Sequence, residues 1–446
     1  MDSPLLNQDS SYWRRNLAII WLSQFITYVG FDVALPFTPF YMRECLEVPE
    51  TMLRTYVGMS SAFPSLLLAI MAPIWGLLAD RLGRKLMILR ANYLGGVVFA
   101  LMGLSPQLAR LAGACGMSFV TPVGVFLTLR LLQGIFTGTT SAAMTLVSSS
   151  APRERQGYAL AILSTAIYSG EIGGMLLGGY LSEIFGYQKS FYLCGATWIF
   201  SGIFVHIFAV ENFKRPLITA VKAKNELLTK LNIVVFPALP LFLTYILSSF
   251  ARFLDSSQLP LVIEQLNGGP AMPYAARWTS IILAAGFIGA MLSGTTVGRL
   301  IDRNAKLVFS IAAACGGLLM LSILIPLVTS FGQSRMHLSL PGLPSDGSTS
   351  MIFMLAVRFG IVFCSATFEP VLNSWLSKIT TPENKGNMFG SAVTFRSGGA
   401  VITHSMAAFL ATNWGFRSLY IFGPCCYAII IPVIFLVERR LHNRLI

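Results

Sequence analysis

The chain has 446 residues, of which 54% are hydrophobic and 11% are charged, and its formal net charge is +13. Soluble domains carry about 25% charged residues, so this composition excludes a water-soluble globular domain. The mean hydropathy of +0.68 indicates a protein that lies in the lipid bilayer.

Twelve apolar segments are long enough to cross roughly 30 Å of hydrocarbon as α-helices. In chain order they lie near residues 16–42, 54–79, 86–106, 120–148, 157–185, 191–210, 233–263, 277–300, 307–330, 351–376, 387–412 and 418–437. We therefore predict an all-α membrane protein with twelve transmembrane helices. Because the polar start of the chain precedes a segment long enough to span, we expect no cleaved signal peptide.

The distribution of basic residues predicts which side of the membrane each loop occupies. When the segment ends are assigned to alternate sides, 21 Lys and Arg residues fall on the side of the two chain ends and 7 fall on the other. The positive-inside rule then places both termini in the cytoplasm. The positive net charge is therefore explained by the membrane topology. We expect anionic membrane lipids as neighbours and no nucleic-acid partner.

The longest charged stretch lies near the middle of the chain, at residues 211–232. We interpret it as a cytoplasmic linker. It divides an N-terminal six-helix bundle, residues 1–210, from a C-terminal six-helix bundle, residues 233–446.

Two short motifs recur in the two predicted halves. The sequence "GLLADR" at Gly76–Arg81 returns as "GRLIDR" at Gly298–Arg303, and "RLLQG" from Arg130 returns as "RFGIV" from Arg358. The first offset is 222 residues and the second is 228 residues. Two echoes in the same order and at nearly the same offset indicate duplication of a six-helix unit.

The loop after the second apolar segment, Gly76–Lys85, concentrates charge and glycine between two hydrophobic segments. Gly83 permits a tight turn there. Asp80 can accept hydrogen bonds at a helix N-terminus, where the helix dipole favours an anion. The three bases of the loop are suited to pairing with acids or lipid headgroups: Arg81, Arg84 and Lys85.

At this loop the chain resembles the major facilitator superfamily, whose signature between helices 2 and 3 is G-x-x-x-D-R-x-G-R-K. Leu129–Gly138 resembles the helix 4 motif of that family, and Pro36–Pro39 resembles the end of its helix 1. The glycines of the fifth segment resemble the antiporter motif of the drug:proton antiporter branch with twelve helices. In that motif a Gly-Pro pair is expected, but Gly174 is followed by Met175, which leaves export less firmly indicated.

The resemblance extends over essentially the whole chain and includes bacterial multidrug efflux proteins. It implies the major facilitator fold, with two pseudo-symmetric six-helix bundles around a central cavity. It also implies a cytoplasmic gate that holds the outward-facing state. The residues of this gate would be Gly76, Asp80, Arg81, Gly83, Arg84 and Lys85, with a second copy at Asp302 and Arg303.

Ionisable residues inside apolar segments are costly, and they usually face a cavity or a partner. Burial favours the protonated form of the Asp32 carboxyl group, so this acid is a candidate proton carrier. By resemblance, Arg130 in the fourth segment takes part in proton coupling. Glu171 follows Gly170 on the same helix and is rotated about 100° from it around the helix axis, so its side chain can face the cavity. The remaining proton-coupling candidate, an acid without an obvious local partner, is Glu369.

For Asp32, Arg130 and Glu171, a structural ion pair is the alternative role, and Asp32 could also lie close to the membrane surface. The substrate-cavity candidates are Tyr28, Phe31, Tyr168, Arg252, Asp255, Arg358 and Arg396. Arg252 and Asp255 stand three residues apart, so we expect them to pair on one helix. A cavity with aromatic walls and few acids suits amphipathic cations. A small-residue stripe suited to helix packing is formed by Gly170, Gly174 and Gly178.

The sequence contains no nucleotide-binding loop, metal-ligand cluster or catalytic triad. We therefore expect no enzyme activity, no metal and no cofactor, and a proton gradient as the energy source. The predicted function is efflux of hydrophobic or amphipathic small molecules by a proton-coupled, monomeric transporter of the bacterial inner membrane. The alternative is a dedicated transporter of one metabolite or siderophore-like anion, outward or inward, with the intramembrane arginines as its binding site.

Overall fold

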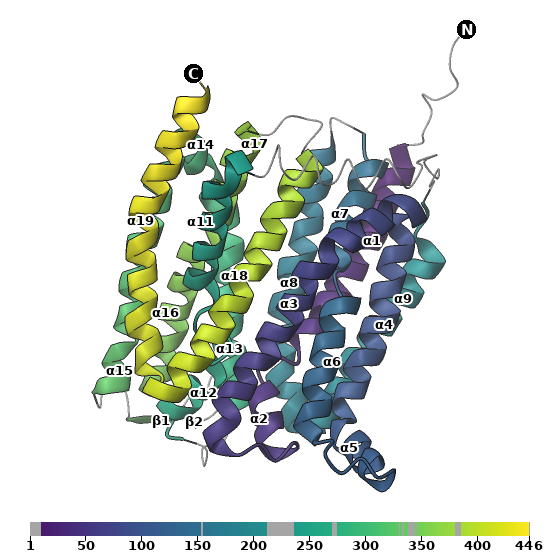
Figure 1. Cartoon of the computed structure of the whole chain (residues 1–446), viewed down its shortest axis with the longest axis vertical. Helices are drawn as coiled ribbons and strands as arrows, with labels where there is room; N and C mark the ends of the chain where they lie inside the picture. The colour runs from purple at the N-terminus through teal and green to yellow at the C-terminus, as the bar shows by residue number, and fades with distance from the viewer. Residues whose placement is uncertain are drawn as a thin grey trace. The chain divides into compact units, whose positions relative to one another are not determined.

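The computed structural model describes residues 10–152, 155–211, 236–269, 274–329, 331, 334–337, 344, 346–379 and 385–445. Within these ranges the chain is helical almost throughout (Figure 1). The exception there is a hairpin of two antiparallel strands, β1 (Arg335–His337) and β2 (Asp346–Ser348), with Met336 opposite Gly347.

Every predicted apolar segment contains at least one helix in its described part. The first six contain α1 (Ser10–Asp32), α2 (Thr38–Glu44), α3 (Glu50–Leu82), α4 (Arg84–Gly103), α5 (Ser105–Ala114), α6 (Pro122–Phe136), α7 (Thr139–Ser150), α8 (Gln156–Phe185) and α9 (Tyr187–Phe208). The last six contain α11 (Phe236–Phe253), α12 (Leu259–Leu266), α13 (Ala275–Thr296), α14 (Gly298–Ser322), α15 (Leu324–Val328), α16 (Thr349–Ala366), α17 (Phe368–Ile379), α18 (Lys385–Trp414) and α19 (Arg417–Leu445). Among the described residues, nine helical spans are long and apolar enough to cross a membrane.

Five predicted segments contain two consecutive helices for much of their length. They are the first (α1 and α2), the fourth (α6 and α7), the seventh (α11 and α12), the ninth (α14 and α15) and the tenth (α16 and α17). The first and fourth positions are thus interrupted in both predicted halves. This correspondence supports the duplication that the two sequence echoes indicate. Interruptions are informative, because lipid offers no hydrogen bonds and an unwound backbone needs partners inside the protein.

The chain forms two compact units. The first comprises Met1–Leu35 and Met71–Leu217, and the second comprises Pro36–Ile70 and Ile218–Ile446. The second unit thus includes α2 and the first part of α3. Arg54 of α3 ties this segment to the unit. Its carbonyl accepts from Gln258 Nε2, directly before α12, at 2.9 Å, and its Nη1 atom donates to the Ala411 carbonyl of α18 at 2.8 Å. The predicted boundaries at residues 210 and 233 stay a prediction, since residues 212–235 lie outside the described chain.

In the first unit, glycines bring helices into backbone contact. A Cβ atom added at Gly174 of α8 would lie 2.5 Å from the Val29 carbonyl oxygen of α1, and one at Gly170 would lie 2.7 Å from the Phe25 carbonyl oxygen. Any side chain at these positions would therefore push α1 and α8 apart. Gly178 lies one turn further along α8.

A buried polar network joins three helices of the same unit. Thr27 of α1 donates to Asn92 of α4 at 3.3 Å, and Asn92 Nδ2 donates to the Ser201 hydroxyl of α9 at 3.2 Å. The Ser23 and Ser201 hydroxyls lie 2.8 Å apart. All four side chains are at most 2% exposed. These hydrogen bonds satisfy polar groups that the hydrocarbon could not, and so they fix the mutual register of α1, α4 and α9.

Candidate functional site

The glycine seam between α1 and α8 positions two acids in the first unit. Asp32 ends α1 and is 3% exposed, and its Cβ would lie 3.0 Å from a Cβ added at Gly174. Its Oδ2 atom has no hydrogen-bond partner among the described residues. The Asp32 and Glu171 carboxyl groups interact electrostatically. Two carboxylate charges repel each other, and a single shared proton would relieve that repulsion.

Arg130 lies in the same buried region of the first unit. It is 5% exposed on α6, and its Nη1 atom donates to Gln133 Oε1 at 2.9 Å. The buried Cys194 side chain of α9 lies near both Arg130 and Asp32. Arg130 and Asp32 are therefore both buried near the same residue of α9, and their role in proton coupling stays a prediction.

The fourth predicted segment, which contains α6 and α7, is interrupted close to the middle of its span, residues 122–150. Gly138 adopts φ +106° there, which favours glycine, and α7 begins directly after it. Thr139 donates to Gln24 Oε1 at 3.0 Å, and the Thr140 hydroxyl lies 2.6 Å from the Tyr28 hydroxyl. The break therefore presents polar groups at the depth where a transporter of this architecture binds its solute.

In the second unit, Asp255 pairs with Arg358 rather than with Arg252. Arg358 Nη1 lies 2.8 Å from each carboxylate oxygen of Asp255, and the two side chains are 5% and 3% exposed. The expectation that Asp255 pairs with Arg252 was wrong, because α11 ends at Phe253 and the chain turns before α12. The helical spacing on which that expectation depended does not continue to Asp255.

Glu369 has a partner that the sequence did not reveal. It forms an ion pair with Arg396 of α18, and Arg252 of α11 adds a second attractive interaction. Nearby, the Tyr245 hydroxyl donates to Asn373 Oδ1 at 2.6 Å. The Glu369 and Arg396 side chains are 38% and 39% exposed, so this pair is accessible, in contrast to the sealed Asp255–Arg358 pair.

The loop between α3 and α4 is clamped to the end of α9. Gly83 makes the turn with φ +101°, and the Glu211 carboxylate accepts the backbone N–H groups of Arg84 and Lys85, each at 2.8 Å. Lys85 Nζ in turn donates to the Ala209 carbonyl at 2.6 Å and the His206 carbonyl at 2.9 Å. Each helix end is thereby capped by a charge of the sign its dipole favours.

The gate role of this loop stays a prediction. The side chains of Asp80, Arg81 and Asp302 lie outside the described part of the structure, and Arg303 is exposed. Of the aromatic cavity candidates, Phe31 contacts the rings of Phe99 and Trp198. The half-buried Tyr168 lies on α8, three residues before Glu171.

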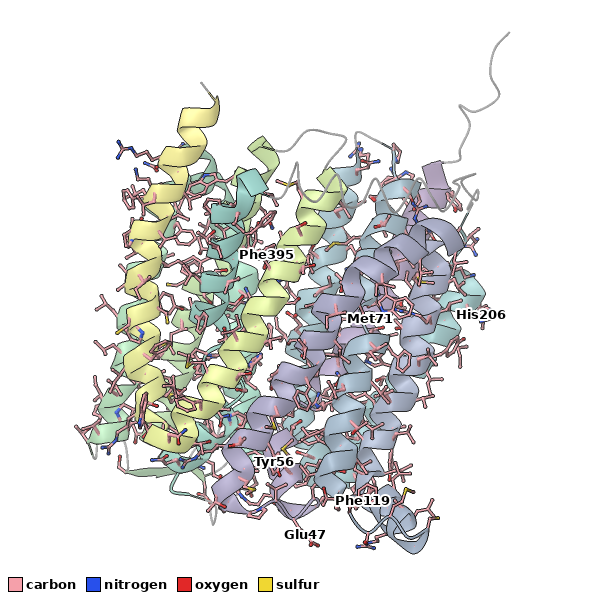
Figure 2. All side chains as sticks on the ribbon, viewed as in Figure 1. Glu47, Tyr56, Met71, Phe119, His206 and Phe395 are labelled. Carbon is pink, nitrogen blue, oxygen red and sulfur yellow. The ribbon has the colours of Figure 1, made fainter. Side chains whose placement is uncertain are left out.

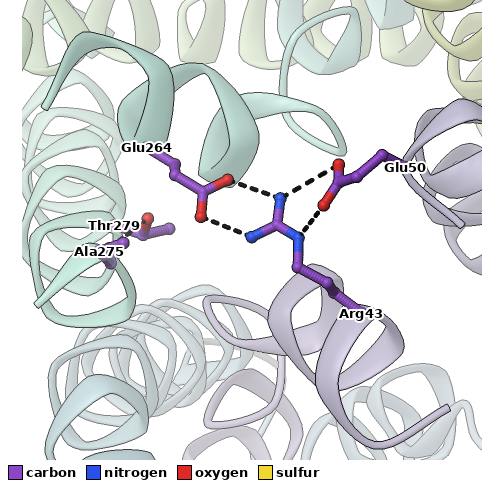
Figure 3. Close-up of polar contacts among 5 residues, drawn as sticks. All are labelled: Arg43, Glu50, Glu264, Ala275 and Thr279. Atoms are coloured by element: carbon purple, nitrogen blue, oxygen red, sulfur yellow. Dashed lines mark hydrogen bonds and ion pairs between the residues drawn. The ribbon is translucent and has the colours of Figure 1, made fainter. Parts of the chain in front are cut away.

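An ionic cluster that sequence reasoning missed joins α2, α3 and α12 (Figure 3). Arg43 donates to the two Glu264 carboxylate oxygens at 2.6 and 2.8 Å and also forms an ion pair with Glu50. The Arg43 and Glu264 side chains are 19% and 7% exposed, whereas Glu50 is 63% exposed. Hydrogen bonding to Glu264 raises the pKa of Arg43, which keeps the guanidinium charged. No signal in the sequence marks this cluster, because Arg43 and Glu264 are 221 residues apart.

These features define a helical integral membrane protein that pairs charges across interrupted spanning helices, which is the architecture of a secondary transporter. The family model described as the Major Facilitator Superfamily matches residues 20–343. The chain belongs to this family of membrane transporters, as its motifs predict, and it is not an enzyme.

Relatives and solved structures agree with this assignment. The multidrug resistance protein MdtG of Escherichia coli is 28% identical over 424 residues, covering 94% of this chain and 93% of that protein. A bacterial homologue of the human lysosomal transporter Spinster, in an inward-facing and occupied conformation, has a TM-score of 0.67 at 14% identity, covering 97% of this chain and 98% of that one. A D-xylose–proton symporter has a TM-score of 0.70 at 16% identity, covering 95% and 97%. The predicted all-α major facilitator fold is confirmed.

The buried ion pair of the second unit yields a stability prediction. Asp255→Asn leaves the Arg358 guanidinium buried without its counter-charge, so we expect a loss of about 3–5 kcal/mol in the free energy of unfolding. Thermal unfolding in detergent, followed by tryptophan fluorescence, measures the change. The double variant Asp255→Leu with Arg358→Met removes both charges and should recover most of the loss. Equal destabilisation by the single and double variants would contradict this role for the pair.

Proposed function

We propose that this chain is a proton-coupled transporter that exports hydrophobic or amphipathic small molecules by alternating access. The observation that carries the proposal is the electrostatic interaction between Asp32 and Glu171, two acids of the first unit. Arg130 is buried in the same unit. The similarity to MdtG over nearly the whole chain supports the multidrug substrate class. We further propose a monomer in the bacterial inner membrane, with both termini in the cytoplasm.

The proposed cycle transfers one proton against one substrate molecule. A proton held by the Asp32–Glu171 pair leaves to the cytoplasm, and the resulting carboxylate attracts the substrate from that side. The two units then change their arrangement, the substrate leaves to the outside, and a proton from the outside returns to the pair. The transport cycle needs no energy source other than the proton gradient, because this gradient drives the return step.

A second candidate is transport of one anionic metabolite. Arg396 and Arg252 both act on Glu369, so this accessible cluster carries one more positive than negative charge. Such an excess favours an anion rather than a cation. An anionic solute would use the second unit as its main binding surface, and the acids of the first unit would then serve only for coupling.

Transport in inside-out membrane vesicles with an acidic lumen tests the proposal. A lipophilic cation added outside should be taken up while protons leave the lumen, and both signals should disappear in Asp32→Asn and in Glu171→Gln. A control is Glu47→Gln, an exposed acid in the loop between α2 and α3 whose side chain points away from the helices (Figure 2). Cation uptake without proton movement would contradict proton coupling. Uptake of an anionic metabolite alone would instead favour the second candidate.

We also propose that the Arg43–Glu264 pair holds the outer ends of α2, α3 and α12 together, and that it opens when substrate leaves. Breaking it should loosen the half-buried Cys45, whose thiol pKa burial raises to about 11. In a Cys115→Ser background, Arg43→Gln and Glu264→Gln should therefore speed labelling of Cys45 by a membrane-impermeant maleimide. Glu50→Gln, which removes an exposed partner, is the matched control.

Charge exchange separates the ion pair from general destabilisation. With Glu50→Gln present, Arg43→Glu combined with Glu264→Arg should return Cys45 labelling to the original slow rate. Labelling that stays equally slow in Arg43→Gln would show that the pair does not hold these ends together.

A further inference from the structure

The helices α14 and α19 are neighbours in the second unit (Figure 1). A groove opens between their ends. Its volume is about 960 Å³. Four lining residues are apolar: Ile431, Pro432, Phe435 and Leu436. The remaining three are charged: Lys306, Glu438 and Arg439.

The groove lies where the two helices leave the hydrocarbon. Lys306 stands at the start of the span Arg303–Val328, and Arg439 is the last residue of the span Arg417–Arg439. These two cations therefore lie at the depth of the lipid headgroups, whereas Ile431 and Pro432 lie up to two turns deeper along α19. The predicted topology assigns this end to the cytoplasmic leaflet, where anionic lipids concentrate.

Local geometry holds Lys306 at the groove. Asn304 leaves helical geometry, with φ −155° and ψ 79°, and its side chain accepts the Leu307 N–H at 3.1 Å. The ammonium group of Lys306 lies 2.9 Å from Glu438 Oε2 and 4.2 Å from the centre of the Phe435 ring. It is 33% exposed, so one side remains open to a ligand.

The charges of the groove do not cancel. Lys306 and Arg439 contribute two positive charges, and Glu438 contributes one negative charge, which leaves one positive charge beside an apolar wall. An anionic headgroup complements this excess, and the exposed Phe435 and Leu436 side chains offer a surface for an acyl chain. A soluble anion would not use the apolar wall, and a neutral lipid would not use the excess charge.

We propose that the groove between α14 and α19 binds one anionic phospholipid, with its phosphate at Lys306 and Arg439 and an acyl chain along α19. The bound lipid would hold α14 against α19, the last helix. It would do so directly after the second copy of the gate motif, Gly298–Arg303. This inference does not depend on which solute the protein transports or on proton coupling.

Lipid retention by the full-length protein tests the proposal. The protein is reconstituted into nanodiscs that contain equimolar phosphatidylglycerol and phosphatidylcholine. It is then released from them, and the lipids that stay bound to it are identified by native mass spectrometry. We expect selective retention of one phosphatidylglycerol. Each basic side chain near an anionic surface is worth about fivefold in affinity, so Lys306→Gln and Arg439→Gln should each reduce the selectivity about that much. Glu438→Gln removes a repulsive charge and should increase it.

The control is Arg15→Gln, which removes an exposed base on the same predicted side but in the first unit. It should leave the selectivity unchanged. Equal retention of the two lipids by the unaltered protein would overturn the proposal, because the groove would then bind acyl chains only. Unchanged selectivity in the variant that combines Lys306→Gln with Arg439→Gln would also overturn it. Thermal unfolding of each variant shows that it is folded.

Discussion

The hydrocarbon interior of the bilayer contains no water, so a polar group placed there must find its partner within the protein. This constraint accounts for the contacts that determine the structure. Asp255 and Arg358 neutralise each other in the second unit, and a Ser, Thr and Asn network joins α1, α4 and α9 in the first. Because an unsatisfied group costs several kcal/mol in this environment, these contacts specify which helices pack together and in what register.

The same constraint makes the incompletely satisfied groups informative. Asp32 is buried with one carboxyl oxygen that lacks a hydrogen-bond partner among the described residues, and it faces a second acid. The helix break at Gly138, by contrast, places hydrogen-bonded polar groups in the middle of a span. Such features add nothing to the stability of the fold, and we propose that they serve the binding of a solute and a proton.

Much of the fold could be predicted from the sequence, since spanning helices follow from long apolar runs and the family from the loop at Gly76–Lys85. The interruptions were missed even though Gly138 and Pro260 mark two of them, because an apolar run continues through each. The pairing of Asp255 failed because it depended on a helix that ends two residues earlier. Contacts such as Arg43 with Glu264 join residues 221 positions apart, and only the packed chain brings them together.

If the acids of the first unit exchange a proton for the transported molecule, binding of that molecule must release the proton. The most direct measurement is proton release when a lipophilic cation binds to the purified protein in weakly buffered detergent solution, followed with a pH-sensitive dye. We expect proton release to accompany binding and to be lost in Asp32→Asn, while the Glu47→Gln control still releases protons. Tight binding of the cation with no proton release from the unaltered protein would contradict it.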